Sequence, residues 1–207
     1  MQKDALLNMG KSTFAIAGIV VIFATVWALK PRAGTFQQKT RAFYKSQPVG
    51  AHEPLKIVGI KATRRTLGLS EQFTAADDWL RDAELTVKNI SGKDIVFVEI
   101  DLDFPETIAS GDEMSFPLRL GSRPNNLNLN PPVVLQIDAD ATLTVDAKKY
   151  EEVVKFIEHR HSMGEIGKVN VTVGFVIFSD GTAWTAGKFL RRDPNNLNRY
   201  ITIQANN

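Results

Sequence analysis

The sequence predicts a mainly β protein, an antiparallel β-sandwich with one crossover helix, preceded by an N-terminal transmembrane helix. Three observations lead to this fold class. Residues 12–29 contain no charge between Lys11 and Lys30. Several later segments alternate apolar and polar residues with a period of two, which is typical of strands with one buried face. One stretch, residues 148–160, places its apolar residues at helical spacing instead.

The apolar run at residues 12–29 is long enough to cross a bilayer. Its eighteen residues would span roughly 27 Å as a helix, close to the ~30 Å hydrocarbon core. We therefore expect a single-pass signal anchor that follows a short N-terminal tail, residues 1–11. One alternative is a secretory signal peptide cleaved after Ala28, because a short basic head and a small residue at the cleavage site are typical of such peptides. A second is a buried core helix, although helices of globular domains rarely run for eighteen residues without a polar face.

Residues 30–53 predict a basic juxtamembrane linker, in which prolines, glycines, cations and aromatic residues follow one another. The cations suit anionic lipid headgroups, and Trp27 suits the membrane interface. The candidate lipid-contacting residues are therefore Trp27, Lys30, Arg32, Lys39, Arg41 and Lys45.

Two arguments about the side of the membrane point in opposite directions. Cations after the apolar run outnumber those before it, which by the positive-inside rule favours a cytoplasmic domain. A short N-terminal tail and a β-rich domain without nucleotide or metal motifs favour the periplasmic side of a bacterial cell membrane, which is our expectation. The chain contains no cysteine, so it has no disulfides and no thiolate metal sites.

Residues 54–207 predict the β-sandwich domain. The longest alternating segments, each predicted to be a strand, are residues 95–104, 133–146 and 169–178. Shorter candidate strands are residues 55–63, 83–89, 115–120, 182–190 and 200–204. The helix at 148–160, with Asp146 as its N-cap, lies between two long strands, so it should cross one end or edge of the sheets.

Residues 85–106, LTVKNISGKDIVFVEIDLDFPE, carry a resemblance to known domains. A hydrophobic strand ends at Asn89, Ser91 and Gly92 follow, and a longer alternating strand comes next. This pattern resembles the opening strand pair of Ig-like β-sandwich modules in bacterial envelope proteins, of the FxLYD and water-stress late-embryogenesis types. Residues 176–196 are similar to their closing hairpin, although the Phe-x-Leu-Tyr-Asp signature is absent. The resemblance implies a membrane-anchored binding or scaffolding module without catalytic residues.

The net charge of +2 is unevenly distributed. Residues 1–52 contain seven Lys or Arg against one acid, whereas residues 53–207 contain eighteen against twenty-two acids. The predicted domain is thus mildly acidic, which argues against nucleic acid as its partner.

No motif in the chain predicts catalysis or a cofactor. A nucleophile elbow, a dinucleotide-binding loop and a Walker loop are all absent from the sequence. His159 and His161 would lie on opposite sides of a helix, which prevents them from sharing a metal ion. We therefore expect a protein that is not an enzyme and that holds no cofactor or metal.

Two Asp-x-Asp pairs leave an alternative open. They are Asp101 with Asp103 and Asp138 with Asp140. Such pairs could bind calcium or act as acid and base, which would make the chain a membrane-tethered hydrolase or a secreted calcium- or carbohydrate-binding module. Alternate acids are also what the solvent face of an amphipathic strand displays.

The better candidate for recognition is the Asn-rich loop at residues 123–132. It is long, polar and punctuated by prolines, and two leucines within it are possible exposed anchors. The candidate interaction residues are Arg123, Asn125, Asn126, Leu127, Asn128 and Leu129. We expect the chain to bind the bilayer through residues 12–29 and a protein partner in the membrane or envelope through its domain.

Overall fold

The computed structural model describes residues 38–46, 52–111, 113–125 and 127–203. The predicted transmembrane helix at residues 12–29 lies outside these ranges. Within these ranges, no helix has the length and hydropathy of a membrane span.

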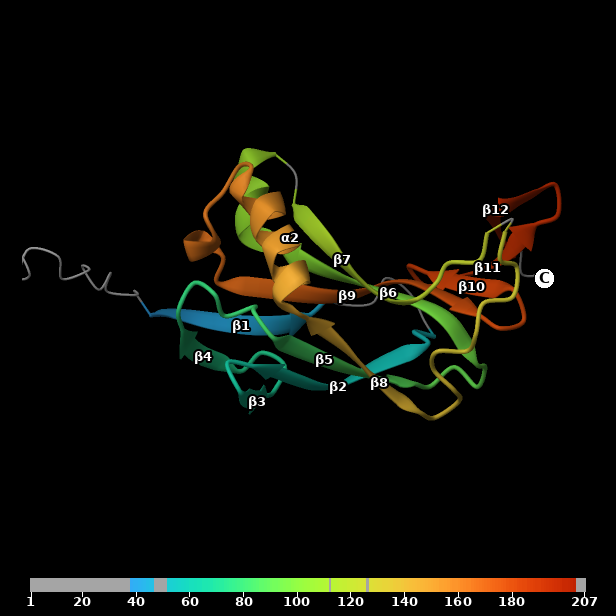
Figure 1. Ribbon diagram of the computed structural model, residues 1–207, viewed down its shortest axis with the longest axis horizontal. Helices are drawn as coiled ribbons and strands as arrows, with labels where there is room; N and C mark the ends of the chain where they lie inside the picture. Colours follow the sequence, from blue (N-terminus) through green and yellow to red (C-terminus); the bar gives the residue numbers. More distant parts are fainter. Residues whose placement is uncertain (1–37, 47–51, 112, 126, 204–207) are drawn as a thin grey trace, which may run out of the picture. The chain divides into compact units, whose positions relative to one another are not determined.

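The described residues build two β-sheets (Figure 1). The four-stranded sheet, in the order β3–β2–β5–β8, contains β2 (Leu55–Ala62), β3 (Arg65–Leu67), β5 (Ala83–Asn89) and β8 (Asp140–Val145). The eight-stranded sheet contains β1 (Lys39–Lys45), β4 (Gln72–Ala75), β6 (Ile95–Phe104), β7 (Met114–Gly121), β9 (Lys168–Phe178), β10 (Thr182–Thr185), β11 (Lys188–Asp193) and β12 (Asn196–Thr202).

Strand β9 organises the larger sheet. One of its edges pairs with β6, which continues to β7. The other edge is shared, because residues 168–171 pair with β1 and residues 176–177 pair with β10. Strand β4 extends the sheet from β1, whereas β11 and β12 extend it from β10. The β1–β9 pair is parallel, so this sheet is mixed and the prediction of a purely antiparallel fold is wrong for it.

The main hydrophobic core lies between the two sheets. Burial alternates along β5 at every position, as the period-two pattern predicts, and Leu85 and Val87 enter the core. Trp79 packs edge to face on Phe43 at 5.1 Å and on Phe73 at 5.7 Å between ring centroids. These rings join the loop before β5 to β1 and β4.

The predicted crossover helix is confirmed as α2 (Ala147–Glu158), which connects β8 of one sheet to β9 of the other. Asp146 is its N-cap, with Oδ1 accepting a hydrogen bond of 2.8 Å from the Lys149 N–H. Its buried face contains Tyr150, Val153 and Ile157. Two 3-10 turns, η1 (Pro105–Ser110) and η2 (Met163–Glu165), complete the regular structure.

Two strand predictions need correction. Residues 133–146 are not one strand, because the chain turns at Asp138, where φ is 59°, and β8 begins only at Asp140. The preceding segment bonds to Ile95, whose carbonyl accepts from both Val134 and Leu135. Residues 182–190 form a hairpin, since Ala186 and Gly187 both have positive φ and separate β10 from β11.

The expected linker at residues 30–53 also differs from the structure. Residues 39–45 are β1, part of the same compact unit as the strands that follow. Phe43 packs in the main core, and Arg41 is buried with it. This strand contains three cations beside its apolar residues, Lys39, Arg41 and Lys45, which is why its sequence is typical of a basic linker.

Candidate functional site

The Asn-rich loop begins where β7 ends, at a position that requires glycine. Gly121 has φ of 82°, and a Cβ there would lie 2.3 Å from the Val96 carbonyl oxygen. The chain then turns away from the sheet. Pro124 and Pro131, which lie near the two ends of the loop, are both buried.

The tip of this loop is a tight turn closed by Asn125 and Asn128. The N–H of each residue donates to the carbonyl of the other, at 3.0 and 3.2 Å. The Asn125 side-chain oxygen also accepts from the N–H groups of Leu127 and Asn128, both at 2.9 Å. Asn126 lies outside the described residues. The turn therefore holds Leu127 by hydrogen bonds on both sides of it.

Leu127 projects into solvent from this turn and is 98% exposed, while Leu129 is 46% exposed. The sequence predicts both as possible exposed anchors; the structure shows that both side chains are exposed, and their role as anchors stays a prediction. An exposed leucine on a turn closed by two backbone hydrogen bonds and two bonds to the Asn125 side chain is available to a partner with little loss of conformational entropy.

Arg123 lies instead against the domain. Its Cζ is 4.5 Å from the ring centroid of Phe175 and 5.6 Å from that of Phe97. Phe97 belongs to a second, smaller hydrophobic cluster, and Phe175 and Tyr200 pack on that cluster. Arg123 thus tethers the start of the loop to this cluster through cation–π contacts.

A cavity of about 540 Å³ opens beside the loop. Four parts of the chain line it: the loop, the start of β6, the end of β9 with the turn that follows it, and strand β11. The lining residues are Val96, Pro124, Leu129, Asn130, Pro131, Phe178, Ser179, Asp180, Gly181 and Arg192. An apolar wall with a few convergent polar groups is the usual composition of a ligand site.

Two charged side chains line this cavity. Asp180 accepts from Lys93 Nζ at 2.7 Å and from the Thr182 hydroxyl at 2.6 Å. Burial by itself would raise the pKa of Asp180, but the hydrogen bonds from Lys93 and Thr182 and the Lys93 charge outweigh it, so the pKa is lowered. Arg192 lies over the Tyr200 ring at 5.9 Å, and its buried Nε has no hydrogen-bond partner among the described residues.

The acidic pairs do not form one site. Asp101 and Asp103 lie on β6 of the larger sheet, whereas Asp140 begins β8 in the other sheet and Asp138 lies in the turn before it. Across the described ranges, no group of three or more His, Cys, Asp or Glu side chains is placed to hold a metal. The two pairs are associated with different sheets.

Asp101 nevertheless has an unusual environment. Burial, followed by the charges of Glu99 and Asp103, raises its pKa to about 6. Asp103 accepts a hydrogen bond of 2.6 Å from the Thr172 hydroxyl, and Glu99 pairs with Arg119 at 2.6 Å. Contacts from β9 and β7 therefore hold the acidic side chains Asp103 and Glu99 of β6 in place.

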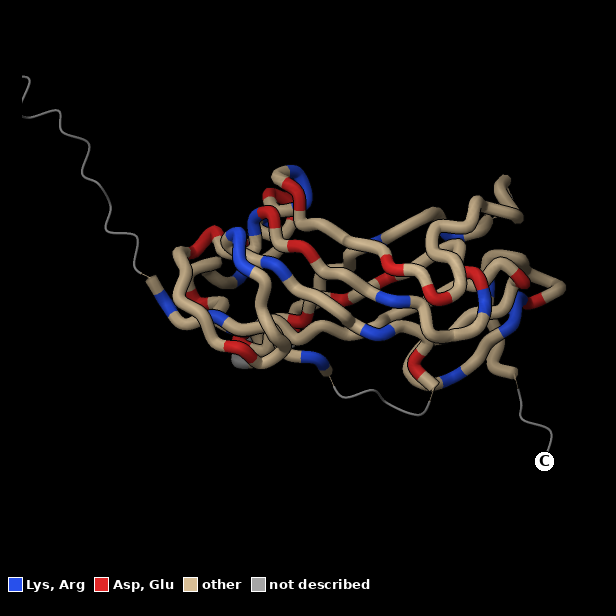
Figure 2. The backbone as a smooth tube through the Cα atoms, turned by 90° about the horizontal axis from the view of Figure 1, so that it is seen from below, with Lys and Arg blue, Asp and Glu red and all other residues tan. Residues whose placement is uncertain are grey.

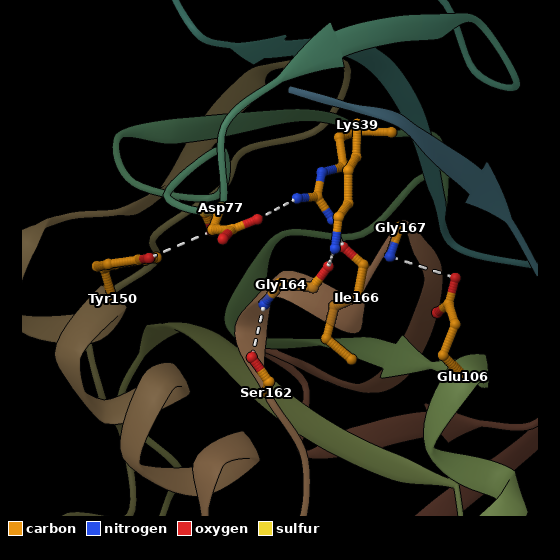
Figure 3. A network of polar contacts seen from close by, with 9 residues as sticks. Lys39, Asp77, Glu106, Tyr150, Ser162, Gly164, Ile166 and Gly167 are labelled. Atoms are coloured by element: carbon orange, nitrogen blue, oxygen red, sulfur yellow. Dashed lines mark hydrogen bonds and ion pairs between the residues drawn. The ribbon is translucent and has the colours of Figure 1, made fainter. Parts of the chain in front are cut away.

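The predicted lipid-contacting cations of β1 make contacts within the domain, and Figure 3 shows those of Lys39 and its surroundings. Arg41 is 1% exposed, and it donates to the Ile166 carbonyl and, at 2.7 Å, to the Asp77 carboxylate. Lys39 donates to the Gly164 carbonyl at 2.7 Å, and Lys45 pairs with Glu53.

Figure 3 shows that this network joins β1, the loop before β5, α2 and the segment around η2. Glu106 adds a contact at its margin by accepting from the Gly167 N–H at 3.3 Å. The geometry gives Arg41 a structural role. The other candidate lipid-contacting residues, Trp27, Lys30 and Arg32, lie outside the described residues.

Comparison with family models, with curated proteins and with solved structures gives no match for this chain. The sequence predicts the loop but indicates neither Arg192 nor the Lys93–Asp180 pair as part of a site. The loop and Arg192 of β11 are far apart in the sequence, so no local sequence pattern predicts that they line the same cavity.

Proposed function

We propose that this chain is a non-catalytic binding module, an accessory subunit at a bacterial cell envelope, which engages a protein partner through the loop at residues 123–132. The observation that carries the proposal is Leu127, a large apolar side chain that is almost fully exposed on a hydrogen-bonded turn. Covering a leucine side chain contributes about 1.5–3 kcal/mol of apolar burial, which is set against the entropy that association costs.

The surroundings of Leu127 support this proposal. Leu129 is half-exposed on the same loop and also lines the cavity. Arg123 anchors the loop to the domain, so the apolar side chains project from a fixed base. A partner could therefore contact the loop tip and the cavity together, which would combine an apolar anchor with polar specificity.

The proposal includes the Ig-like β-sandwich kinship and the membrane anchor. Two sheets around one core, joined by a single described helix, support the sandwich. The uncharged run at residues 12–29 supports single-pass anchoring with the domain on the periplasmic side. Protease treatment of intact spheroplasts tests the orientation: digestion of the domain agrees with it, and protection contradicts it.

The binding role is tested by photo-crosslinking. The full chain carries a photoreactive residue at position 127 or, as the control, at position 108. Ile108 is also an exposed apolar residue, 55% accessible, but it lies on η1 and not on the loop. We expect a discrete protein adduct in native membranes from position 127 only. Equal adducts from both positions, or none from either, would contradict the proposal.

A further inference from the structure

The cavity beside the loop presents a cation that the described residues leave unneutralised. Arg192 takes part in none of their ion pairs, and its Nε is buried without a hydrogen-bond partner. Its described neighbour is the Tyr200 ring, which it faces across the β11–β12 pair. A guanidinium has five donors, and an unused fork in a cavity wall matches the two oxygens of a carboxylate.

The acid that lines the same cavity does not compete for Arg192. Asp180 is occupied by Lys93 at 2.7 Å and by the hydroxyl and N–H of Thr182 at 2.6 and 2.9 Å. The Lys93 charge offsets the Asp180 charge. With Lys93 counted beside the lining residues Asp180 and Arg192, the net charge at the cavity is +1, and Arg192 is the cation that no acid pairs with among the described residues.

The surrounding strands strengthen this positive field. Figure 2 shows Lys and Arg interspersed with Asp and Glu along most of the described chain. Strands β11 and β12 are an exception, since they contain Lys188, Arg191, Arg192 and Arg199 against the single acid Asp193. An anionic group approaching this end of the domain is attracted before it enters the cavity.

We propose that this cavity binds a carboxylate of an acidic peptide segment of the partner, with Arg192 as the residue that pairs with it. This inference rests on the proposed binding role and adds the chemical group that the partner contributes. Asn130 and Ser179 provide neutral polar groups, and Val96, Leu129 and the two prolines provide apolar walls for the carbons that carry the acid. Leu127, two residues before Leu129, contacts an adjacent apolar residue of the same peptide.

A recessed cation favours a peptide over a bilayer. Arg192 is partly buried in the cavity wall, and its Nε is fully covered. A carboxylate on a flexible side chain or at a C-terminus can enter such a recess. The phosphates of a flat lipid surface meet projecting cations instead. The volume of about 540 Å³ is also that of a site for a small ligand or a few side chains.

The test is an NMR titration of the full chain in detergent micelles with two defined peptides. One is acetyl-Gly-Leu-Glu-Leu-Gly-amide, and the other replaces Glu with Gln. We expect the Glu peptide to shift the Arg192 Nε–Hε signal and the Ser179 and Gly181 amides. We expect its dissociation constant to be about tenfold lower than that of the Gln peptide, as a charge-assisted hydrogen bond predicts.

Variants at neighbouring positions provide the matched control. Arg192→Gln should abolish the tenfold preference for the Glu peptide. Arg191→Gln removes the same charge from the adjacent, exposed residue on the other face of β11 and should leave the preference intact. Arg192→Lys, which keeps the charge and packing but loses the fork, should retain only part of it. Far-UV circular dichroism checks that each variant is folded.

Three results would overturn the inference. They are equal affinity for the two peptides, equal effects of Arg192→Gln and Arg191→Gln, and stronger Arg192 shifts with dihexanoyl phosphatidylglycerol than with the Glu peptide. The last result would assign the cavity to a lipid headgroup. An adduct at position 127 without peptide discrimination would leave the binding role standing and remove only this assignment. A preference for the Glu peptide without an adduct at position 127 would leave the carboxylate assignment standing and remove the proposed binding role.

Discussion

The carboxylate of Asp101 occupies the space that a side chain at Gly174 would need. A Cβ built on Gly174 would lie 2.2 Å from Asp101 Oδ2 and 3.0 Å from Asp101 Cγ. The two residues belong to the paired strands β6 and β9. Glycine at position 174 thus lets the acid lie over the neighbouring strand, where it is half-covered.

Gly174→Ala should destabilise the domain by about 1–2 kcal/mol, because the methyl group forces Asp101 out of its position. The measurement is urea denaturation of the single variants Gly174→Ala and Asp101→Ala and of the double variant. In the double variant the clash is gone, so the cost of Gly174→Ala should largely disappear. A cost that is the same with and without Asp101 would show that the strain lies elsewhere.

The stability of the folded chain should depend on the protonation of Asp101. The pKa of an unperturbed aspartate side chain is 3.8, whereas that of Asp101 in the folded chain is about 6. The folded state therefore holds more protons between about pH 4 and pH 6, and the free energy of unfolding falls as pH rises through this window.

Asp101→Asn removes this dependence, because asparagine has no charge to desolvate. The variant should be more stable than the parent chain at pH 7.5 by about 1 kcal/mol, after allowance for solvent screening of a half-buried group. The difference should vanish near pH 4. Urea denaturation at both pH values measures it. A variant that is less stable than the parent at pH 7.5 would contradict the assignment.

Arg41→Met should destabilise the domain by about 2–3 kcal/mol, because the buried Ile166 carbonyl loses its charged donor and Asp77 loses its partner. Lys39→Met is the matched control on the same strand. Lys39 is only partly buried, and its loss should cost about 0.5 kcal/mol. The two unfolding curves give the comparison. Similar costs would mean that the Arg41 contacts add no stability beyond a surface ion pair.

Arg41 also shows where sequence reasoning ends. Strands β5, β6 and β9 and helix α2 were predictable, since each carries its period within a few residues of chain. Strand β1 was not, because a buried arginine is stabilised by Asp77 and Ile166, which no local pattern connects to it. A basic sequence beside an apolar run reads as membrane-proximal unless those partners are known.

The candidate site also has one part that the sequence predicts and one part that it does not. The loop was predictable from its prolines and asparagines, and its exposed leucines follow from a turn that Asn125 closes locally. The cavity was not predictable, since it exists only where the loop meets Arg192 of β11 and the turn after β9. The pairing of β9 with both β6 and β10 brings these segments together.

Arg123→Ala should release the loop without unfolding the domain. The Arg123 side chain contacts Phe175 and Phe97, and losing these cation–π contacts should cost about 1 kcal/mol. Because this contact fixes the base of the loop, hydrogen exchange of the Asn125 and Asn128 amides should accelerate about fivefold.

Leu127→Ser is the control for this effect, since it changes the exposed tip and leaves the Asn125 hydrogen bonds in place. It should alter neither the exchange rates nor the free energy of unfolding by more than about 0.5 kcal/mol. The two variants then separate a loop held by Arg123 from a turn that is stable by itself. Unchanged exchange in Arg123→Ala would show that Asn125 alone keeps Leu127 in position.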